Sequence, residues 1–319
     1  MTLAQLRTLA AVVEAASFSA AAERLAMTQS GVSHAIADLE TELGVSLLYR
    51  DRGGPVPTAV GERILAHAHE MLRRQEHIRQ EAAGAAGLEV GKVRVGTPPS
   101  AGARLLPGML AALSRRHPGI EVIPFEGSDP EVDGWLRSRA VDVGVVPLPA
   151  RGLETVDLVS DEMLLVVPTA HSLAGRASVR PREVAAEPFI MSKGGCEPMI
   201  REVYRAAGVQ PSVQYEVRDM STILAMVQEG LGVTMMPVLS LPPEAPNVRA
   251  VRLEPPVRRR LALAVLSLAE APPAVAMFLR EGHRWARDKF ARGGLRHVEH
   301  RSASDSNKRP PSVRRGAPR

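Results

Sequence analysis

The stretch from Ser17 to Leu43, SFSAAAERLAMTQSGVSHAIADLETEL, constrains the fold most, because its pattern is that of two helices separated by a short turn. In the second part, apolar residues recur at spacings of four, three and four from Val32 to Leu43, which places them on one helix face. We expect Thr28 to cap this helix and Gly44 to end it in the left-handed conformation. The apolar face predicts a folded helical domain.

A shorter helix precedes this one. We expect Ser19 to cap a helix over Ala20–Leu25, and Ala26-Met27 to form the corner between the two helices. The second helix carries small or hydrogen-bonding side chains on its opposite face: Gln29, Ser30, Ser33, His34 and Ala37. Such side chains fit a DNA major groove, where amides and hydroxyls contact base edges. A polar outer face is equally typical of a solvated helical hairpin, so this pattern alone leaves both interpretations open.

The residues that follow, VSLLYRDRGGPVPT from Val45 to Thr58, predict a two-stranded hairpin with a Gly-Gly-Pro tip. This hairpin would form a wing beside the helix. Arg50 and Arg52 precede the tip, where a guanidinium can hold a phosphate with two hydrogen bonds or enter a minor groove. An arginine-bearing wing beside a groove-sized helix favours nucleic-acid binding over a merely solvated surface.

The run from Leu3 to Gly61 closely resembles the winged helix-turn-helix of LysR-type transcriptional regulators. The shared motifs are Ser17-Phe18-Ser19, Thr28-Gln29-Ser30, Ser33-His34, Leu39-Glu40, Leu43-Gly44-Val45, Thr58 and Gly61. The resemblance implies a transcription factor that binds double-stranded promoter DNA, with contacts from Thr28, Gln29, Ser30, Ser33, His34, Arg50 and Arg52. The chain departs from the family at Gly31, where Pro or Ala is common, and glycine inside a helix costs about 1 kcal/mol relative to alanine.

A longer helical pattern begins at Ala59. Its apolar positions follow heptad spacing, at Ile64, Ala68, Met71, Gln75, Ile78 and Ala82. This spacing predicts a seam between two helices, and therefore a homodimer, or a tetramer built from dimers. The polar Gln75 leaves open the alternative that the helix lies on its own domain. A Gly/Ala-rich break, AAGAAGLEVG from Ala82 to Gly91, marks the end of this linker.

From Lys92 the periodicity changes to a β-α-β-α-β pattern that occurs twice. The first half has strands at 93–96, Ile120–Phe125 and Val141–Val146 and helices at Arg104–Arg116 and Glu131–Ser138. The second half has strands at Phe189–Met191, Val213–Val217 and Val233–Met236 and helices at Met199–Ala207 and Thr222–Glu229. Two strands, Thr155–Val159 and Met163–Val167, are expected between the halves, and Leu261–Leu268 with a helix over Ala274–Phe290 is expected to return to the first half. This plan predicts a two-lobed α/β domain with a separate parallel-rich sheet in each lobe.

The cleft of such a domain lies beyond the carboxyl ends of its strands, where loops meet helix N-termini. Residues 91 to about 269 resemble the LysR-type effector domain, which is similar in fold to periplasmic solute-binding proteins, through GKVRVGTPPSAGARLLP and VQEGLGVTMMP. The loops and the resemblance place these residues near a small-molecule effector: Thr97, Ser100, Ser128, Pro147, Gly195, Cys196 and Ser221. We expect a polar or anionic effector, although Glu197 is acidic where relatives often carry a positive or small residue.

The chain has one cysteine, Cys196, which excludes an intrachain disulfide and fits a reducing, cytoplasmic setting. Cys196 follows two glycines ahead of a helix, so we expect backbone N–H groups to favour its thiolate. Three roles are open: a residue of the cleft, a small buried filler, or a redox switch. The lack of a second cysteine makes a switch based on an internal disulfide the weakest of these.

The net charge of +5 resides in the C-terminal tail. Beyond residue 291 the chain has eight Lys or Arg and two acidic residues, and this net charge of +6 exceeds the +5 of the whole chain. DNA binding is therefore inferred from the motif and not from charge. We divide the chain into a DNA-binding domain (1–58), a linker and dimerisation helix with hinge (59–90), an effector-binding domain (91–291) and a basic tail expected to be disordered (292–319).

The sequence lacks the spacing patterns of common catalytic, nucleotide and zinc sites. We therefore expect no enzyme activity, no cofactor and no metal site. No run approaches the roughly 18 apolar residues of a membrane span, and we expect no membrane partner. The prediction is a ligand-responsive transcription factor of LysR type. The alternative is a cytoplasmic solute-binding protein or an α/β enzyme in which the N-terminal hairpin only mediates assembly.

Overall fold

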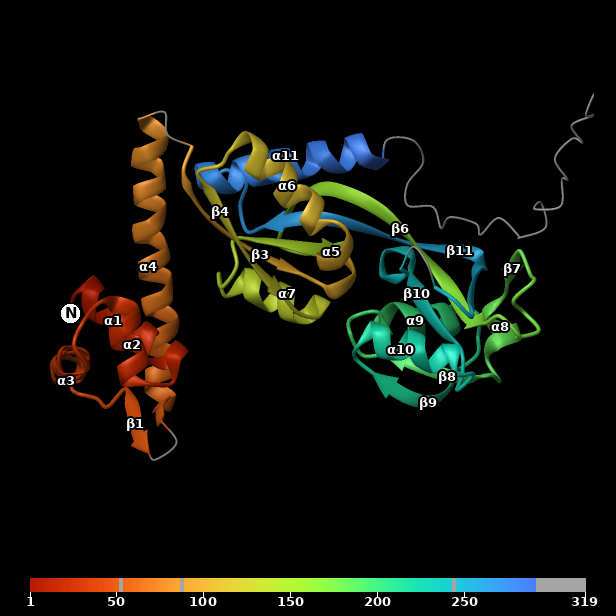
Figure 1. The fold of residues 1–319 in the computed structure, drawn as a ribbon, viewed down its shortest axis with the longest axis horizontal. Helices are drawn as coiled ribbons and strands as arrows, with labels where there is room; N and C mark the ends of the chain where they lie inside the picture. Colours follow the sequence, from red (N-terminus) through yellow and green to blue (C-terminus); the bar gives the residue numbers. More distant parts are fainter. Residues whose placement is uncertain (52–53, 87–88, 243–244, 291–319) are drawn as a thin grey trace, which may run out of the picture.

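Three parts follow one another along the chain in the computed structural model, which describes residues 1–51, 54–86, 89–242 and 245–290. A small helical head leads into a long helix, and a two-lobed α/β domain follows (Figure 1). The head comprises α1 (Leu3–Ala15), α2 (Phe18–Leu25), α3 (Gln29–Leu43), β1 (Leu48–Asp51) and β2 (Gly54–Pro57). The predicted basic tail, 292–319, lies outside the described residues.

The ends of α3 are set by the residues that the sequence predicts. Thr28 Oγ1 accepts a hydrogen bond from a first-turn N–H at 3.1 Å, and Gly44 ends the helix with a φ of 67°. The start of α2 differs from the expectation. Ser17 has an extended backbone and accepts a hydrogen bond from the Ala20 N–H at 3.3 Å, so it caps the helix. The prediction that Ser19 caps this helix was wrong, because Ser19 already lies inside its first turn.

The head closes around α1, whose apolar side packs against α2, α3 and the wing. The buried residues include Leu6, Leu9, Val12, Ala21, Val32, Ile36, Leu39 and Leu47. Glu40 of α3 holds the wing in place, because its carboxylate accepts hydrogen bonds from the N–H groups of Leu47 at 2.7 Å and Leu48 at 3.2 Å. β1 and β2 pair antiparallel, which confirms the predicted hairpin beside the helix.

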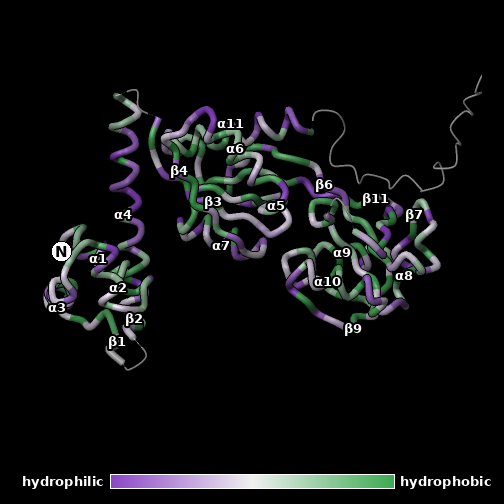
Figure 2. The backbone as a smooth tube through the Cα atoms, in the orientation of Figure 1, coloured by the Kyte–Doolittle hydropathy of each residue, from purple (hydrophilic) through white to green (hydrophobic). Residues whose placement is uncertain are grey.

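The long helix α4 (Ala59–Ala85) carries the predicted heptad seam. Near its start, Ile64 and Ala68 pack into the core of the head. Farther along, the apolar side chains of Met71 and Ile78 are 42% and 70% exposed. The other residues in the middle of this helix are mostly hydrophilic (Figure 2). The first part of the seam therefore serves the helix's own domain, as the alternative interpretation proposed, and the second part is left uncovered in the single chain.

The effector domain has two lobes joined by two long strands, β6 (Glu154–Pro168) and β11 (Val248–Val265). The first lobe contains β3 (Gly91–Thr97), α5 (Pro99–Arg104), α6 (Leu106–Arg116), β4 (Ile120–Glu126), α7 (Asp129–Arg137), β5 (Val143–Pro147) and α11 (Pro273–Phe290). The second contains β7 (Ser178–Val179), α8 (Pro181–Val184), β8 (Pro188–Ser192), α9 (Glu197–Ala206), β9 (Ser212–Val217), α10 (Met220–Gln228), β10 (Thr234–Pro237) and the 3-10 turn η1 (Val238–Ser240). As predicted, α11 returns to the first lobe, where Phe278 is buried in one core with Met109.

The sheet arrangement differs from the expectation. β6 is one strand of 15 residues where two strands were predicted, and β11 has 18 residues and begins well before Leu261. These strands pair antiparallel and join both lobes in a sheet ordered β10-β6-β11-β5-β3-β4. β3 is parallel to β4 and β5, and β8 pairs separately and parallel with β9. The prediction of an independent sheet in each lobe was wrong, because the crossover strands are continuous.

A buried ion pair lies where β6 and β11 pass between the lobes. Arg259 Nε and Nη2 donate hydrogen bonds to Asp161 Oδ2 at 3.0 and 2.9 Å, and the two side chains are 3% and 0% exposed. The other carboxylate oxygen of Asp161 accepts a hydrogen bond from the Leu239 N–H at 3.2 Å. Arg259 Nη2 also donates to Ser100 Oγ at 2.8 Å. The pair therefore links both crossover strands to α5 and η1.

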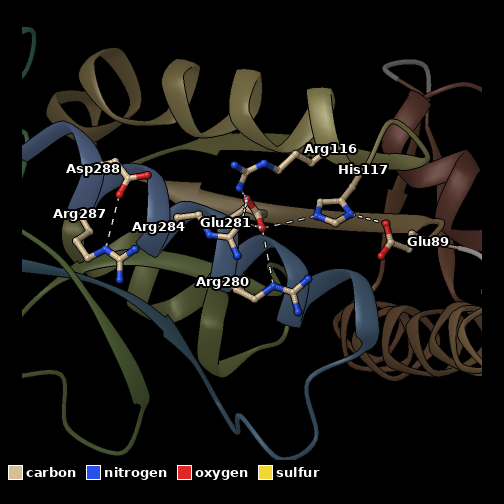
Figure 3. A network of polar contacts seen from close by, with 8 residues as sticks. All are labelled: Glu89, Arg116, His117, Arg280, Glu281, Arg284, Arg287 and Asp288. Atoms are coloured by element: carbon tan, nitrogen blue, oxygen red, sulfur yellow. Dashed lines mark hydrogen bonds and ion pairs between the residues drawn. The ribbon is translucent and has the colours of Figure 1, made fainter.

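A second polar network joins α11 to the beginning of the effector domain (Figure 3). Glu281 of α11 is buried and accepts a hydrogen bond from Arg116 Nη1 at 2.6 Å. His117 Nε2 lies 3.8 Å from Glu281, and His117 Nδ1 is hydrogen-bonded to Glu89 Oε2 at 2.5 Å. Glu89 lies just ahead of β3, so this network fastens the segment after the linker helix to the first lobe.

We predict that Asp161→Asn lowers the free energy of unfolding by about 3–5 kcal/mol, because it leaves the Arg259 guanidinium buried beside a neutral amide. Asp157→Asn is a matched control, since it removes the same charge from the Asp157–Arg260 pair, whose side chains are 62% and 63% exposed. The control should cost no more than about 1 kcal/mol. Urea unfolding followed by circular dichroism measures both losses, and equal losses would contradict a special role for the buried pair.

Candidate DNA-binding and effector sites

The first turn of α3 presents a polar surface. Thr28, Gln29, Ser30 and His34 are exposed, and Ser33 is half-buried. Gln29 Nε2 donates a hydrogen bond to Ser33 Oγ at 3.2 Å, and the hydroxyl oxygens of Thr28 and Ser30 lie 3.2 Å apart. The structure therefore brings these five predicted residues together at one end of the helix, whose other face is buried in the head.

The wing carries the two remaining predicted contacts. Arg50 belongs to β1, where it lies opposite Pro55 in the register of the hairpin. The side chain of Arg50 and the whole of Arg52 lie outside the described residues. Their roles stay predictions from the sequence, while the described parts of the hairpin place the wing next to α3.

A cavity of about 870 Å³ separates the two lobes. Its walls come from the first turns of α5, α7 and α10 and from η1, and include Pro99, Ser100, Ser128, Glu131, Gly194, Arg218, Asp219, Met220, Ser221 and Ser240. The volume falls in the range of roughly 300–1,000 Å³ that is typical of small-molecule sites. Hydroxyl groups and helix N-termini on both sides suit a small polar ligand.

Seven residues were expected near the effector, and three of them line this cavity: Ser100, Ser128 and Ser221. The other four are absent from its lining: Thr97, Pro147, Gly195 and Cys196. Thr97 is buried under α5, where a Cβ at Gly102 would lie 2.7 Å from its hydroxyl oxygen. The serines therefore remain the best candidates for direct contact with a ligand.

Asp129, at the start of α7, is a half-buried acid with incomplete pairing. Burial raises the pKa of Asp129 above its ordinary value of 3.8, and the charge of Arg259 opposes this shift. Asp129 Oδ1 has no hydrogen-bond partner among the described residues. On the other lobe, Gly195 has a φ of 119°, and a Cβ there would lie 3.3 Å from the Asp129 carboxyl carbon. Gly195 thus permits the close approach of the two lobes at this point.

The mouth of the cavity is bridged by an ion pair between the lobes. Arg218 Nη2 lies 3.4 Å from Glu131 Oε2, and the side chains are 71% and 47% exposed. Glu131 also accepts hydrogen bonds from the Ser128 N–H at 2.7 Å and the Ser128 hydroxyl at 2.6 Å. Because exposed pairs contribute little stability, this bridge can open without a large cost in free energy.

Cys196 is buried in the core of the second lobe, immediately ahead of α9. Burial raises the pKa of the Cys196 thiol above its ordinary value of 9.0, and the charge of Arg259 opposes this shift. The expectation that backbone N–H groups favour the thiolate was wrong, because desolvation of the charged form outweighs them. This placement fits the interpretation of Cys196 as a small buried filler.

The sequence analysis missed Asp161 and Arg259 and gave Asp129 no role. Ser160-Asp161-Glu162 lies between the two strands that the sequence predicts, and Arg258-Arg259-Arg260 lies just ahead of the strand predicted from Leu261, so neither segment was assigned to an element. Successive side chains of a strand alternate between its faces, so the middle residue of each triplet points away from its neighbours. Two acidic residues between apolar runs and three successive arginines ahead of another apolar run were the signal that could have found this pair.

Two other kinds of site are not found in the described ranges. Within them, no group of three or more His, Cys, Asp or Glu side chains is arranged to hold a metal ion. Among the same residues, no helix is both long enough and apolar enough to cross a membrane.

Comparison with known families gives two matches that together span most of the chain. Residues 3–62 match the bacterial regulatory helix-turn-helix proteins of the lysR family, and residues 86–287 match the LysR substrate binding domain. These ranges coincide with the head and the two-lobed domain seen in the structure.

Individual relatives agree with this assignment. The chain is 39% identical over 281 residues to the probable HTH-type transcriptional regulator LrrA of Synechococcus elongatus, covering 88% of this chain and 95% of LrrA. It is 30% identical over 249 residues to a probable hydrogen peroxide-inducible genes activator of Mycobacterium leprae, covering 76% and 80% of the two chains. Full-length CbnR complexed with its target DNA shares the fold, with a TM-score of 0.66, 23% identity and coverage of 89% and 100%. The chain therefore belongs to the LysR family of transcriptional regulators, and it is a DNA-binding regulator with an effector-binding C-terminal domain, not the enzyme or solute-binding protein considered as the alternative.

Proposed function

We propose that this regulator acts in the cytoplasm as a homodimer, contacts the bases of its target DNA with the first turn of α3, and responds to a small polar effector bound between its lobes. The observation that carries the DNA contact is the exposed polar group at the N-terminus of a helix whose other face is buried. Amide, hydroxyl and imidazole groups in that position can hydrogen-bond to base edges in the major groove. CbnR, which shares this fold, has been solved with its target DNA, and this supports a DNA-bound state here.

We predict that Ser33→Glu and His34→Glu each abolish sequence-specific binding, because a carboxylate there is repelled by the phosphates and by the acceptor atoms of the bases. Thr41→Glu is the matched control. It adds the same charge to an exposed position about two turns farther along α3 and should retain specificity. The measurement is a gel shift at physiological salt with the DNA upstream of the protein's own gene. Undiminished specificity in both test variants would refute this docking.

The proposal of a homodimer rests on the uncovered part of the α4 seam. Met71 and Ile78 are one heptad apart, so they lie on the same side of the helix, and both are exposed. Apolar side chains in this arrangement are typical of helices that pack against a second helix. A dimer would also present two heads, each able to bind one half-site of the DNA.

We predict that the double substitution Met71→Glu and Ile78→Glu gives a monomer that binds DNA more weakly, because like charges would be buried between the paired helices. Ile64 is left unchanged, since it packs into the head's own core. Met71→Leu with Ile78→Leu keeps the apolar stripe and should remain a dimer. Sedimentation velocity distinguishes the two. An unchanged dimer mass for the glutamate variant would show that the subunits associate through another surface.

The proposal of a reversible effector rests on the cavity between the lobes. Arg218, Glu131 and Asp219 give its walls charges of both signs, next to the hydroxyls of four serines. The relative from Mycobacterium leprae is named for a response to hydrogen peroxide. Peroxide reacts with thiolates, and the Cys196 thiol of this chain is buried with a raised pKa, which opposes that response here.

We predict that Ser221→Trp blocks the effector response, because the indole would fill the cavity from the exposed first turn of α10. Ser212→Trp, at an exposed position of β9 outside the cavity lining, is the matched control. The assay is the rise in melting temperature across a panel of small polar metabolites, with hydrogen peroxide included as a compound expected to have no effect. A metabolite that stabilises both variants equally would have to bind elsewhere.

A further inference from the structure

A second groove, of about 600 Å³, lies between the head, α4 and the first lobe. α1 and α2 contribute its walls on one side, and β3 and β4 contribute them on the other. Six cationic side chains line it: Arg7, Arg24, Arg73, Arg79, Lys92 and Arg94. Two acidic side chains, Glu14 and Glu76, accompany them. Cationic side chains therefore outnumber acidic ones in this lining, although the head as a whole carries no excess of positive charge.

Arg73 is the buried cation of this groove. It is 8% exposed, yet it makes no hydrogen bond or ion pair with any residue that the structure describes. Burial lowers the pKa of Arg73, Arg94 lowers it further, and Asp142 and Glu70 partly offset these effects. Asp142 is already engaged, because its carboxylate accepts a hydrogen bond from the Arg94 N–H at 2.7 Å. A charge removed from water without a partner is costly, so this position favours an anion.

Three of the neighbouring cations have carboxylate partners: Arg24 lies 3.5 Å from Glu14, Lys92 lies 2.8 Å from Glu121, and Arg94 lies 3.9 Å from Asp142. Arg7 donates a hydrogen bond to the neutral Gln75 amide at 2.8 Å and has no carboxylate partner among the described residues. The Arg79–Glu76 pair is long, at 3.9 Å. The buried His69 Nε2, also on the groove wall, makes no hydrogen bond within the described ranges, and Glu14 Oε1 lies 3.9 Å from it. Arg7 and Arg73 are therefore the two cations of the lining that have no carboxylate partner among the described residues.

We propose that this groove binds a small polyvalent anion of the phosphate type, which pairs with Arg73 and joins the head and α4 to the first lobe. Its volume suits a small molecule. Guanidinium groups hold the oxygens of phosphate with paired, charge-assisted hydrogen bonds. The site is distinct from the cleft between the lobes, with which it shares no lining residue.

Two other possible occupants of the groove, the target DNA and a second subunit, fit it less well. Bound DNA would lie along α3, which Figure 1 shows on the side of the head away from the first lobe. A second subunit paired through the exposed stripe of α4 would cover Met71. Arg73 follows Met71 by two residues, about 200° around the helix, so it faces away from that partner. A free anion therefore remains the occupant that the geometry favours.

The consequence is a control point separate from the effector cleft. An anion held by Arg7 on α1, Arg73 on α4 and Arg94 on β3 would contact all three parts of the chain at once. Its binding would restrict the angle between the head and the effector domain, and with it the spacing of two heads on DNA.

The test uses the full-length protein with sodium pyrophosphate as the probe, in magnesium-free buffer and against sodium chloride at matched ionic strength. We expect a saturable rise in the melting temperature of the wild type beyond that in chloride. Arg73→Met should lose at least about tenfold in pyrophosphate affinity by calorimetry, since it keeps the aliphatic stem and removes the charge. Its melting temperature without pyrophosphate should not fall, because a buried unpaired charge is gone.

Arg74→Met is the matched control, because Arg74 is the neighbouring exposed arginine on α4 and does not line the groove. It should keep wild-type affinity for pyrophosphate, and so should the cleft variant Ser221→Trp. Arg7→Met, at an exposed position, gives a second test if Arg73→Met does not fold. It should also weaken the binding of pyrophosphate. The proposal is overturned if the wild type shows no saturable rise, if Arg73→Met and Arg74→Met respond alike, or if target DNA displaces the pyrophosphate and so proves to be the phosphate source.

Discussion

The effector domain depends on the buried pair of Asp161 and Arg259. Since charges without water are stable only when paired and hydrogen-bonded, β6 and β11 have to keep their register at the point where they pass between the lobes. Arg259 also donates to Ser100 on the cavity wall and opposes the pKa shifts of Asp129 and Cys196. One side chain therefore joins the crossover strands to the cavity wall and opposes the pKa shifts of two nearby buried groups.

The sequence predicted the head most completely, because its signals are local. Thr28 and Gly44 act within a few residues of their helix ends, and heptad spacing marks the apolar side of α4. The crossover strands were not predictable in the same way. Asp161 and Arg259 meet across a separation of 98 residues, and each sits in a short polar segment that resembles a turn or a solvated strand when taken alone. Only pairing between distant segments makes these residues internal.

The orientation of single side chains around the cleft was also not fully predictable from the sequence. Three of the seven residues expected near the effector, Ser100, Ser128 and Ser221, line the cavity. Whether a loop residue faces the cavity or the core depends on the packing beneath it, and a linear sequence does not show this. Cys196 turns into the second-lobe core for that reason. The burial of Arg73 was not predicted for a similar reason, because a single arginine on a polar helix does not indicate that the first lobe will cover it.

The return of α11 to the first lobe has a consequence for the order in which the chain can assemble. Val275 and Phe278 belong to the same core as Val93 and Met109, so that core combines residues from both ends of the effector domain. During synthesis from the N-terminus, the head and most of the second lobe have their residues available earlier. The residues of the second lobe lie in the sequence between two parts of the first lobe, so the first lobe is completed last. The helix α11 therefore completes the core of the first lobe. Synthesis that stops before α11 would give a chain in which this core is incomplete.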